Sequence, residues 1–453
     1  MNNHEEYQRI GDLCSRAMQS YQIDPGHYNK YEVKRGLRNL DGSGVLAGLT
    51  QISEVHGYTI SEDEKAPSPG ELSYRGYDIN DLAANCGRDK RFGFEEVCYL
   101  LLEGRLPNNQ EFDHFRQFLA EHRELPPSFT EDMILKQPSR DIMNKLARSV
   151  LTLYSYDDNP DNCSIANVLQ QSLSLIARLP VIAAYAYRAK RHYYDGSSLI
   201  LHTAKPELSI AENLLRMLRS DRQFTKEEAE ILDMALMLHA EHGGGNNSAF
   251  ACRVLSSSGT DTYAAIAAAI CALKGPRHGG ANAKVMQMMA GLEAAVSNWE
   301  DEGQVYDYLA KIVRKEAGDG SGLIYGMGHA VYTISDPRTL LLKEKARTLC
   351  AERGMGDELK LYELVERLAP EVFHDVKGNT KVISANIDFY SGFVYKMLGI
   401  PQEMYTPLFA IARTAGWCAH RIEEIISGGR IIRPAYKSIC RRGKEFIMPE
   451  DRE

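Results

Sequence analysis

The sequence has no Cys-x-x-Cys pair, no long apolar run and no excess of positive charge. Its nine cysteines are scattered and odd in number, so a zinc ribbon, a thioredoxin-type redox site and a disulfide framework are not expected. The longest uninterrupted apolar stretch covers residues 264–273 and is too short to span a bilayer. With 53 Lys and Arg against 61 Asp and Glu, the formal net charge is -8, which argues against a dedicated nucleic-acid binder.

Nucleotide-binding loops are also missing. No Walker A motif occurs, and the glycine cluster at 318–322 lacks the spacing and the preceding strand of a dinucleotide-binding loop.

The N-terminal residues lack the basic-then-apolar pattern of a signal peptide, so we expect a cytoplasmic protein that does not bind a membrane. What remains is a chain of 453 residues, 44% hydrophobic and 25% charged, with the composition of a globular protein of two or more structural units.

Apolar periodicity predicts an all-α protein, with helical patterns throughout from residue 94 onward. Residues 225–228, Thr-Lys-Glu-Glu, form a capping box that opens a helix. Residues 264–273 predict a buried helix. The segment 402–427 is apolar on nearly every face, which is typical of a buried helix, and its Arg413 is therefore expected in the interior.

A small β-hairpin is expected near the N-terminus. Residues 1–43 are polar and predict a helical extension at the surface. The strand-like runs 44–53 and 71–77 flank an acidic, proline-rich stretch at 61–70. We therefore predict two short strands connected through that stretch.

Four polar clusters lie beside glycines or turns, at 239–248, 275–282, 326–338 and 384–392. In the first cluster, His239 and His242 are three residues apart and are expected to share a helix face. A zinc protease would need His-Glu-x-x-His, and this pattern is His-x-x-His without an evident third ligand. For His239 a hydrogen-bonded core histidine is the simpler interpretation, whereas for His242 structural and functional roles stay open.

The other three clusters combine histidines with a guanidinium and a carboxylate. His278 precedes a helix, whose N-terminal partial charge favours a neutral imidazole that donates a hydrogen bond; a structural histidine beside a tight turn is the alternative. His329 and Arg338 are nine residues apart, and a compact loop would let them bind a carbonyl and a carboxylate of one substrate. Asp388 lies between two apolar residues and is either a general base or a helix N-cap.

These clusters, in this order, resemble the citrate synthase family over about residue 44 to the region after Arg433. The resemblance implies a nearly all-helical fold of two domains with a small N-terminal β-hairpin. The implied parts are an N-terminal extension at 1–43, a large domain at 44–277 and 393–453, and a small domain at 278–392. The active site would lie in the cleft between the two domains.

The resemblance further implies an acyltransferase of the tricarboxylic acid cycle. It would condense acetyl-CoA with oxaloacetate and hydrolyse citryl-CoA to citrate and CoA. Asp388 would take a proton from the acetyl methyl group, His278 would donate to the thioester oxygen, and His329 would polarise the keto oxygen of oxaloacetate.

The same resemblance implies the binding residues. Oxaloacetate would be held by His242, Arg338, Arg413 and Arg433, the last from the other subunit of a homodimer. CoA would contact Gly326, Gly328, Ala330, Lys381 and Asn386. No metal and no redox cofactor is implied, and the CoA thioester is a substrate.

Three alternatives stay open at this point. A 2-methylcitrate synthase would use propionyl-CoA, and the additional methylene is worth only roughly 1–3 kcal/mol in an apolar pocket. A metal-dependent hydrolase would use His239 and His242. A non-catalytic helical binding protein would keep the fold with a degenerate site.

Overall fold

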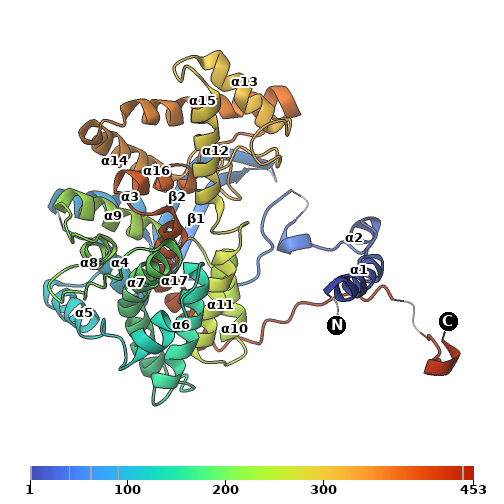
Figure 1. Ribbon diagram of the computed structural model, residues 1–453, viewed down its shortest axis with the longest axis horizontal. Coiled ribbons are helices and arrows are strands. Elements are labelled where there is room, and N and C mark those ends of the chain that lie inside the picture. The colour runs from blue at the N-terminus through green and yellow to red at the C-terminus, as the bar shows by residue number, and fades with distance from the viewer. Residues whose placement is uncertain (1–2, 40, 62–63, 90, 441–442, 453) are drawn as a thin grey trace. The chain divides into compact units, whose positions relative to one another are not determined.

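The computed structural model describes residues 3–39, 41–61, 64–89, 91–440 and 443–452. Over these residues the protein is helical with one three-stranded antiparallel sheet, which confirms the all-α prediction (Figure 1). The chain divides into two compact units. Unit 1 consists of Met1–Asn85, His242–Gly245 and Ala281–Leu398, and unit 2 of Cys86–Glu241, Asn246–Gly280 and Gly399–Glu453. The grouping of the first 85 residues with 281–398 is not indicated by the sequence, and the domain boundaries proposed above stay a prediction.

Unit 1 begins with one long and one short helix in the N-terminal extension and then forms the sheet. Its helices are α1 (Asn3–Ser20), α2 (Gly26–Lys30), α12 (Ala281–Ala295), α13 (Glu302–Val313), α14 (Pro337–Arg353), α15 (Gly356–Lys377) and α16 (Ile387–Met397), and α3 (Ile79–Asp89) continues past its boundary. Helix α16 packs against α12 and α14. The core between α15 and α16 is aromatic, since the ring of Tyr362 lies 5.3 Å from that of Phe389 and 4.7 Å from that of Phe393.

The hairpin differs from its prediction in both strands. Strand β1 (Ser53–Ser61) starts where the predicted strand ends, and β2 (Glu64–Tyr74) takes up the proline-rich stretch, followed by β3 (Tyr77–Asp78). The apolar run at 44–53 was misleading because its leucines are not buried: Leu46 is 85% and Leu49 88% exposed.

An irregularity in the β1–β2 ladder explains how β2 accommodates its prolines. His56 pairs with Glu71 and Tyr58 pairs with Pro67, so one residue of β1, Gly57, lies opposite residues 68–70 of β2. Prolines are tolerated in strands at such bulges, where the regular ladder of hydrogen bonds is interrupted. We refer to Gly57 and residues 68–70 as the hairpin bulge.

Unit 2 is a helical core. It contains α4 (Phe94–Glu103), α5 (Asn109–Glu121), α6 (Ile142–Leu153), α7 (Ile165–Asp195), α8 (Ile210–Leu218), α9 (Lys226–His239), α10 (Asn247–Ser256), α11 (Thr262–Lys274) and α17 (Tyr405–Ile426). Helix α17 packs against α4, α7, α9, α10 and α11. The expected burial of this helix is confirmed, because Arg413 in its middle is 0% exposed. The capping box that opens α9 is also confirmed, with Thr225 and Glu228 each accepting from the other's backbone N–H.

Helix α7 is the one described helix that is long and apolar enough to cross a membrane by length and composition alone. Core helices of globular proteins pass the same test. Here 56% of its most apolar window is buried, and it packs against α6, α8 and α17 of its own unit.

Candidate active site

In unit 1, the loop before α14 is joined to the segment before α16. Met327 forms a β-bridge with Ala385, the Gly328 N–H donates to the Ser384 carbonyl over 2.7 Å, and the Asn386 N–H donates to the Gly326 carbonyl over 2.9 Å. These bonds bring the sequence cluster of His329 beside that of Asp388. Two clusters 59 residues apart in the chain therefore form one site in unit 1.

Gly326 is required for this close approach. Its φ is 79°, and a Cβ at this position would lie 2.8 Å from the Phe389 side chain and 2.9 Å from that of Val285. A left-handed backbone and the absence of space both demand glycine. Asn386 adds a side-chain bond, since its Nδ2 donates to the Gly328 carbonyl over 2.8 Å.

Asp336 connects Arg338 to the start of α16. Its carboxylate accepts from Arg338 Nε over 3.0 Å and from Nη2 over 2.7 Å, and both side chains are buried. The same carboxylate accepts from the backbone N–H of Ile387 over 3.2 Å, at the start of α16. The adjacent negative charge raises the pKa of the Arg338 guanidinium despite its burial, so this cation is permanent.

The imidazole of His329 is oriented by its own loop. Its Nδ1 accepts from the backbone N–H groups of Val331 over 3.1 Å and Tyr332 over 3.2 Å. Burial and the positive charge of Arg338 lower the pKa of His329 to about 4, so the ring is neutral near pH 7. Because Nδ1 is an acceptor, the single ring proton lies on Nε2, which is therefore the donor.

His242 completes an aromatic cluster around His329. The His242 ring lies 5.1 Å from that of His329 at an interplanar angle of 90°, and the Tyr332 ring stacks on His329 at 4.7 Å. His242 Nε2 is 3.1 Å from the Tyr332 hydroxyl. The sequence does not single out Tyr332, because a tyrosine at this position of the motif has no distinguishing spacing.

Asp388 is not the N-cap of α16. Asn386 is the cap, because its Oδ1 accepts from the backbone N–H of Asp388 over 3.0 Å. Asp388 is half-buried in the first turn of the helix, where the partial positive charge of the N-terminus stabilises a carboxylate. The alternative of Asp388 as the N-cap is therefore wrong.

Unit 2 carries the third histidine. His278 lies in a tight turn that needs its two following glycines, since a Cβ at Gly279 would lie 2.3 Å from the Leu273 carbonyl. Its Nε2 is 2.9 Å from the Ser248 hydroxyl and accepts from the Ser248 backbone N–H over 3.3 Å. Burial, with a contribution from Arg413, lowers the pKa of His278 to about 4. The neutral ring is thus an acceptor at Nε2 and a donor at Nδ1.

Arg413 is held by backbone and aromatic contacts. Its Nε donates to the His239 carbonyl over 2.7 Å, and its guanidinium lies 4.7 Å from the centre of the Phe409 ring. His239 itself has Nδ1 2.8 Å from the Ala235 carbonyl and is 2% exposed. His239 is therefore the hydrogen-bonded core histidine that the simpler interpretation expects.

The expectation that His239 and His242 share a helix face is wrong. Helix α9 ends at His239, and His242 lies beyond it in unit 1. Among the residues that the structure describes, no group of three His, Cys, Asp or Glu side chains is placed to hold a metal ion. The hydrolase alternative therefore loses the geometry on which it depended.

The remaining implied contacts are at the surface of their units. Lys381 and Ala330 are exposed, and Arg433 is exposed in the extended segment after α17. That segment is anchored next to the arginine, where the Ile432 N–H donates to the Ser257 hydroxyl over 3.0 Å.

Known proteins are similar to this chain in sequence and fold over almost their full length. The family described as citrate synthase, C-terminal domain, matches residues 39–435. The citrate synthase of Haloferax volcanii is 33% identical over 427 residues, which cover 93% of this chain and 99% of that protein. The 2-methylcitrate synthase 1 of Corynebacterium glutamicum is 32% identical over 418 residues, covering 91% and 97% respectively.

A solved structure extends the match to three dimensions. The citrate synthase of Thermoplasma acidophilum, in a ternary complex with carboxymethyl coenzyme A and oxaloacetate, matches with a TM-score of 0.74 and 26% identity, covering 93% of this chain and 99% of that one. Motif order, the neutral histidines and these relatives lead to one conclusion: the chain belongs to the citrate synthase family.

Proposed function

We propose that this protein condenses acetyl-CoA with oxaloacetate and hydrolyses the resulting citryl-CoA to citrate and CoA. The observation that carries the proposal is the tautomer of His329. Two backbone N–H groups occupy its Nδ1, and the low pKa keeps the ring neutral, so Nε2–H is the donor. A neutral donor in the same loop as a buried arginine suits a substrate that carries both a ketone and carboxylates.

In the first step Asp388 would remove a proton from the acetyl methyl group. The thioester oxygen would meanwhile receive a hydrogen bond from Nδ1–H of His278. A weak carbon acid needs both a base and a donor at the developing oxyanion. The low pKa of His278 supports the donor role, because the neutral ring has a defined N–H and does not compete for the proton.

In the second step the enol carbon would attack the keto carbon of oxaloacetate. The new carbon–carbon bond leaves negative charge on the former keto oxygen, which a hydrogen bond from His329 Nε2–H would stabilise. The proton that Asp388 removed in the first step balances this alkoxide, which becomes the hydroxyl group of citrate. The substrate carboxylates would be held by Arg338, Arg413 and His242. Arginine suits this task because a guanidinium has five N–H donors, so Arg338 keeps donors beyond the two that Asp336 accepts.

The third step would hydrolyse citryl-CoA, with water attacking the thioester carbonyl and CoA thiolate leaving with the proton that water releases. CoA would lie along Gly326, Gly328 and Ala330, with Asn386 and Lys381 as further contacts. The reaction transfers no electrons to or from a cofactor, since the enol supplies the bonding pair and CoA is a substrate.

We also propose a homodimer in which Arg433 reaches the neighbouring site. Two observations support a role beyond its own unit: Arg433 is exposed in an extended segment, and that segment is anchored at Ile432. We also propose a cytoplasmic location, which rests only on the pattern of the N-terminal residues.

The experiment is a thiol-release assay with the full chain, oxaloacetate, and either acetyl-CoA or propionyl-CoA. Faster turnover with acetyl-CoA supports the proposal. A large preference for propionyl-CoA would assign 2-methylcitrate synthase, a class also found among the relatives. No thiol release with either thioester would leave only a non-catalytic protein.

The role of Asp388 is tested by Asp388→Asn in the same assay. We expect turnover to fall about 10²–10⁴-fold with oxaloacetate binding retained, because the base is removed and the carboxylate-binding groups remain. Asp357→Asn is the matched control, since Asp357 also stands in the first turn of a helix of unit 1. Wild-type turnover of Asp388→Asn would refute its role as the base.

A further inference from the structure

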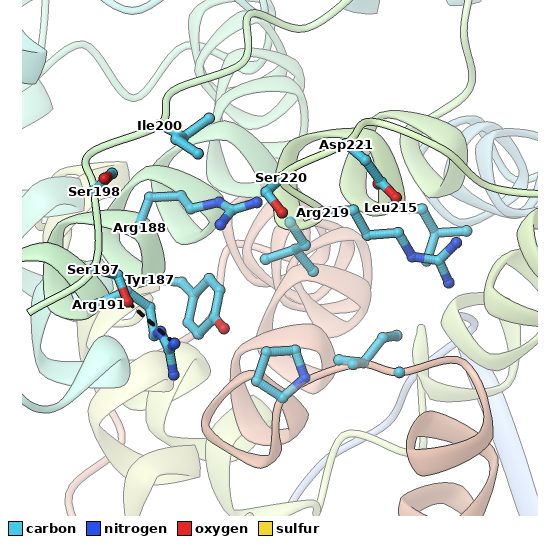
Figure 2. A pocket seen from close by; sticks show the side chains of 14 residues that line it. Tyr187, Arg188, Arg191, Ser197, Ser198, Ile200, Leu215, Arg219, Ser220 and Asp221 are labelled. Carbon is cyan, nitrogen blue, oxygen red and sulfur yellow. Dashed lines mark hydrogen bonds between the residues drawn. The ribbon is translucent and has the colours of Figure 1, made fainter. Parts of the chain in front are cut away.

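A cavity of about 490 Å³ lies entirely within unit 2 (Figure 2). Its wall combines the last turns of α7, residues 197–200, the end of α8 with the residues that follow it, and residues 399–401 before α17. None of the residues assigned above to oxaloacetate or CoA lines it. The volume is within the usual range for small-molecule sites.

The polar part of the wall is predominantly cationic. Three arginines line the cavity, Arg188, Arg191 and Arg219, against one carboxylate, Asp221. Two of the arginines are held in position by groups at their far ends. Arg219 makes a bidentate pair with Glu228, at 2.6 and 3.0 Å, and Arg191 Nη2 donates to the Ser197 hydroxyl over 3.2 Å (Figure 2).

Arg188 differs from the other two because it lacks an acidic partner. Its Nε donates to the Met217 carbonyl over 3.3 Å, while its Nη2 is enclosed and has no hydrogen-bond partner within the described parts of the chain. No carboxylate of those parts is within salt-bridge distance of it. Burial lowers the pKa of this guanidinium, and the opposing effect of Asp221 in the wall does not offset it. A buried, unsatisfied cationic donor is costly unless a ligand or water supplies the acceptor.

The wall also carries apolar side chains that can contact the carbon part of a ligand. They come from three segments of unit 2: Ile200, Leu215, Leu218, Ile400 and Pro401. Three hydroxyl-bearing residues, Ser197, Ser198 and Ser220, line the cavity as well. A ligand that suits this wall has an anionic end and a carbon skeleton with hydroxyl groups.

We propose that this cavity binds a small organic phosphate, with the phosphate group at Arg188 and the carbon skeleton against Leu215 and Ile400. Phosphate suits the wall better than a carboxylate because the residues with possible donors stand on three segments, namely α7, residues 197–198 and Ser220. A tetrahedral dianion presents three terminal oxygens to such an arrangement, whereas a carboxylate presents two in one plane.

The test is calorimetric titration of the full chain with ribose 5-phosphate in the presence of saturating oxaloacetate and CoA, so that the proposed active site is occupied. We expect the wild type to bind one molecule per chain. In Arg188→Gln we expect the affinity to fall by about tenfold or more. Arg222→Gln is the matched control, because Arg222 is exposed on the same loop as Ser220 and does not line the cavity; it should bind as the wild type does. Turnover of acetyl-CoA should be unchanged in both variants.

A second variant covers the case in which Arg188→Gln fails to fold. Ser220→Asp places a negative charge on an exposed residue of the wall and is expected to abolish binding of ribose 5-phosphate. Unchanged binding in Ser220→Asp, or in a folded Arg188→Gln, would overturn the site. Equal binding of ribose, or of succinate, would overturn the assignment of a phosphate ligand.

Discussion

The hydroxyl of Thr333 lies in the hairpin bulge and donates to the carbonyl of Gly57. It also accepts from the backbone N–H of Ser68 over 3.2 Å. Two residues further on, the Ser335 hydroxyl accepts from the Gly70 N–H over 3.3 Å. The segment between His329 and Arg338 is thus attached to both strands of the hairpin, which makes the bulge a support for the candidate active-site loop rather than an irregularity of the sheet.

The first prediction concerns Thr333. Thr333→Val keeps the side-chain shape but leaves the Gly57 carbonyl and the Ser68 N–H without this partner, at a cost of about 1–3 kcal/mol. Because the hydroxyl positions the loop and touches no substrate in the proposed reaction, we expect a higher KM for oxaloacetate with a smaller change in kcat. Thr333→Ser keeps the hydroxyl and should restore KM. Equal KM values in Thr333→Val and wild type would show that the contact has no positioning role.

The second prediction concerns the space at the bulge. A Cβ at Gly70 would lie 2.1 Å from the Ser335 carbonyl and 2.6 Å from the Tyr332 ring. Gly70→Ala must therefore displace the loop that carries His329, and we expect a lower melting temperature together with a higher KM for oxaloacetate. Gly48→Ala is the control, because nothing lies within 4 Å of a Cβ there. A Gly70→Ala variant with wild-type values in both measurements would contradict the close packing.

The third prediction concerns Asp336. Asp336→Asn leaves the buried guanidinium of Arg338 without its negative partner, while the side-chain shape is kept. Breaking a buried ion pair in this way costs about 3–5 kcal/mol. We expect a large loss of unfolding free energy in urea, together with weaker oxaloacetate binding. Asp319→Asn, at an exposed ion pair with Lys284, should lose much less.

The sequence predicts the parts of the site that depend on residue type and local spacing. The interior position of Arg413 follows from the apolar faces of α17, and the capping box of α9 from four consecutive residues. The sequence does not predict the hydrogen bonds and ion pairs that hold the site residues in place. Asp336 reads as a turn residue before a proline, and its bonds to Arg338 and to the start of α16 exist only after folding.

The prediction of the hairpin strands was wrong for a related reason. The run at 44–53 has the composition of a strand, but its burial depends on what packs against it, and Leu46 and Leu49 face solvent. The true strands contain glycines and prolines that local propensity disfavours, and their place is explained by the close approach of the 332–335 loop to Gly57 and Gly70. The end of a helix is also difficult to place from sequence. For this reason the sequence predicts His242 on the same helix as His239, whereas α9 ends at His239.

The fourth prediction is a pH dependence of stability. Burial lowers the pKa values of His278 and His329 to about 4, against an ordinary value of 6.5 in the unfolded chain. As the pH falls from 6.5 towards 4, the unfolded chain therefore binds more protons than the folded one, and stability is lost through this window. Each histidine contributes a loss on the order of 3 kcal/mol when the window has been crossed.

Urea unfolding at several pH values between 7 and 4.5 measures this effect. His278→Gln and His329→Gln should each flatten the pH dependence of the unfolding free energy, whereas His56→Gln, at an exposed side chain, should keep the wild-type slope. For the same reason neither His278 nor His329 should produce a limb near pH 6.5 in the profile of kcat/KM. Slopes that are identical in wild type and in both variants would show that these imidazoles are not held neutral by the fold.

The fifth prediction tests the proposed sharing of Arg433 between subunits. Arg433→Leu and Asp388→Asn should each be nearly inactive as pure proteins, because the first lacks a carboxylate-binding group and the second the base. In a mixed dimer, however, the Arg433→Leu chain keeps its own Asp388 and would receive Arg433 from the Asp388→Asn chain. One of the two sites is then complete, so activity should appear after the two proteins are mixed under conditions that allow subunits to exchange.

If Arg433 served its own chain instead, each chain of the mixed dimer would still lack one essential group, and mixing would restore nothing. Mixing Asp388→Asn with Arg338→Leu is the control, since both changes affect groups of unit 1 in the same chain, and that mixture should stay inactive.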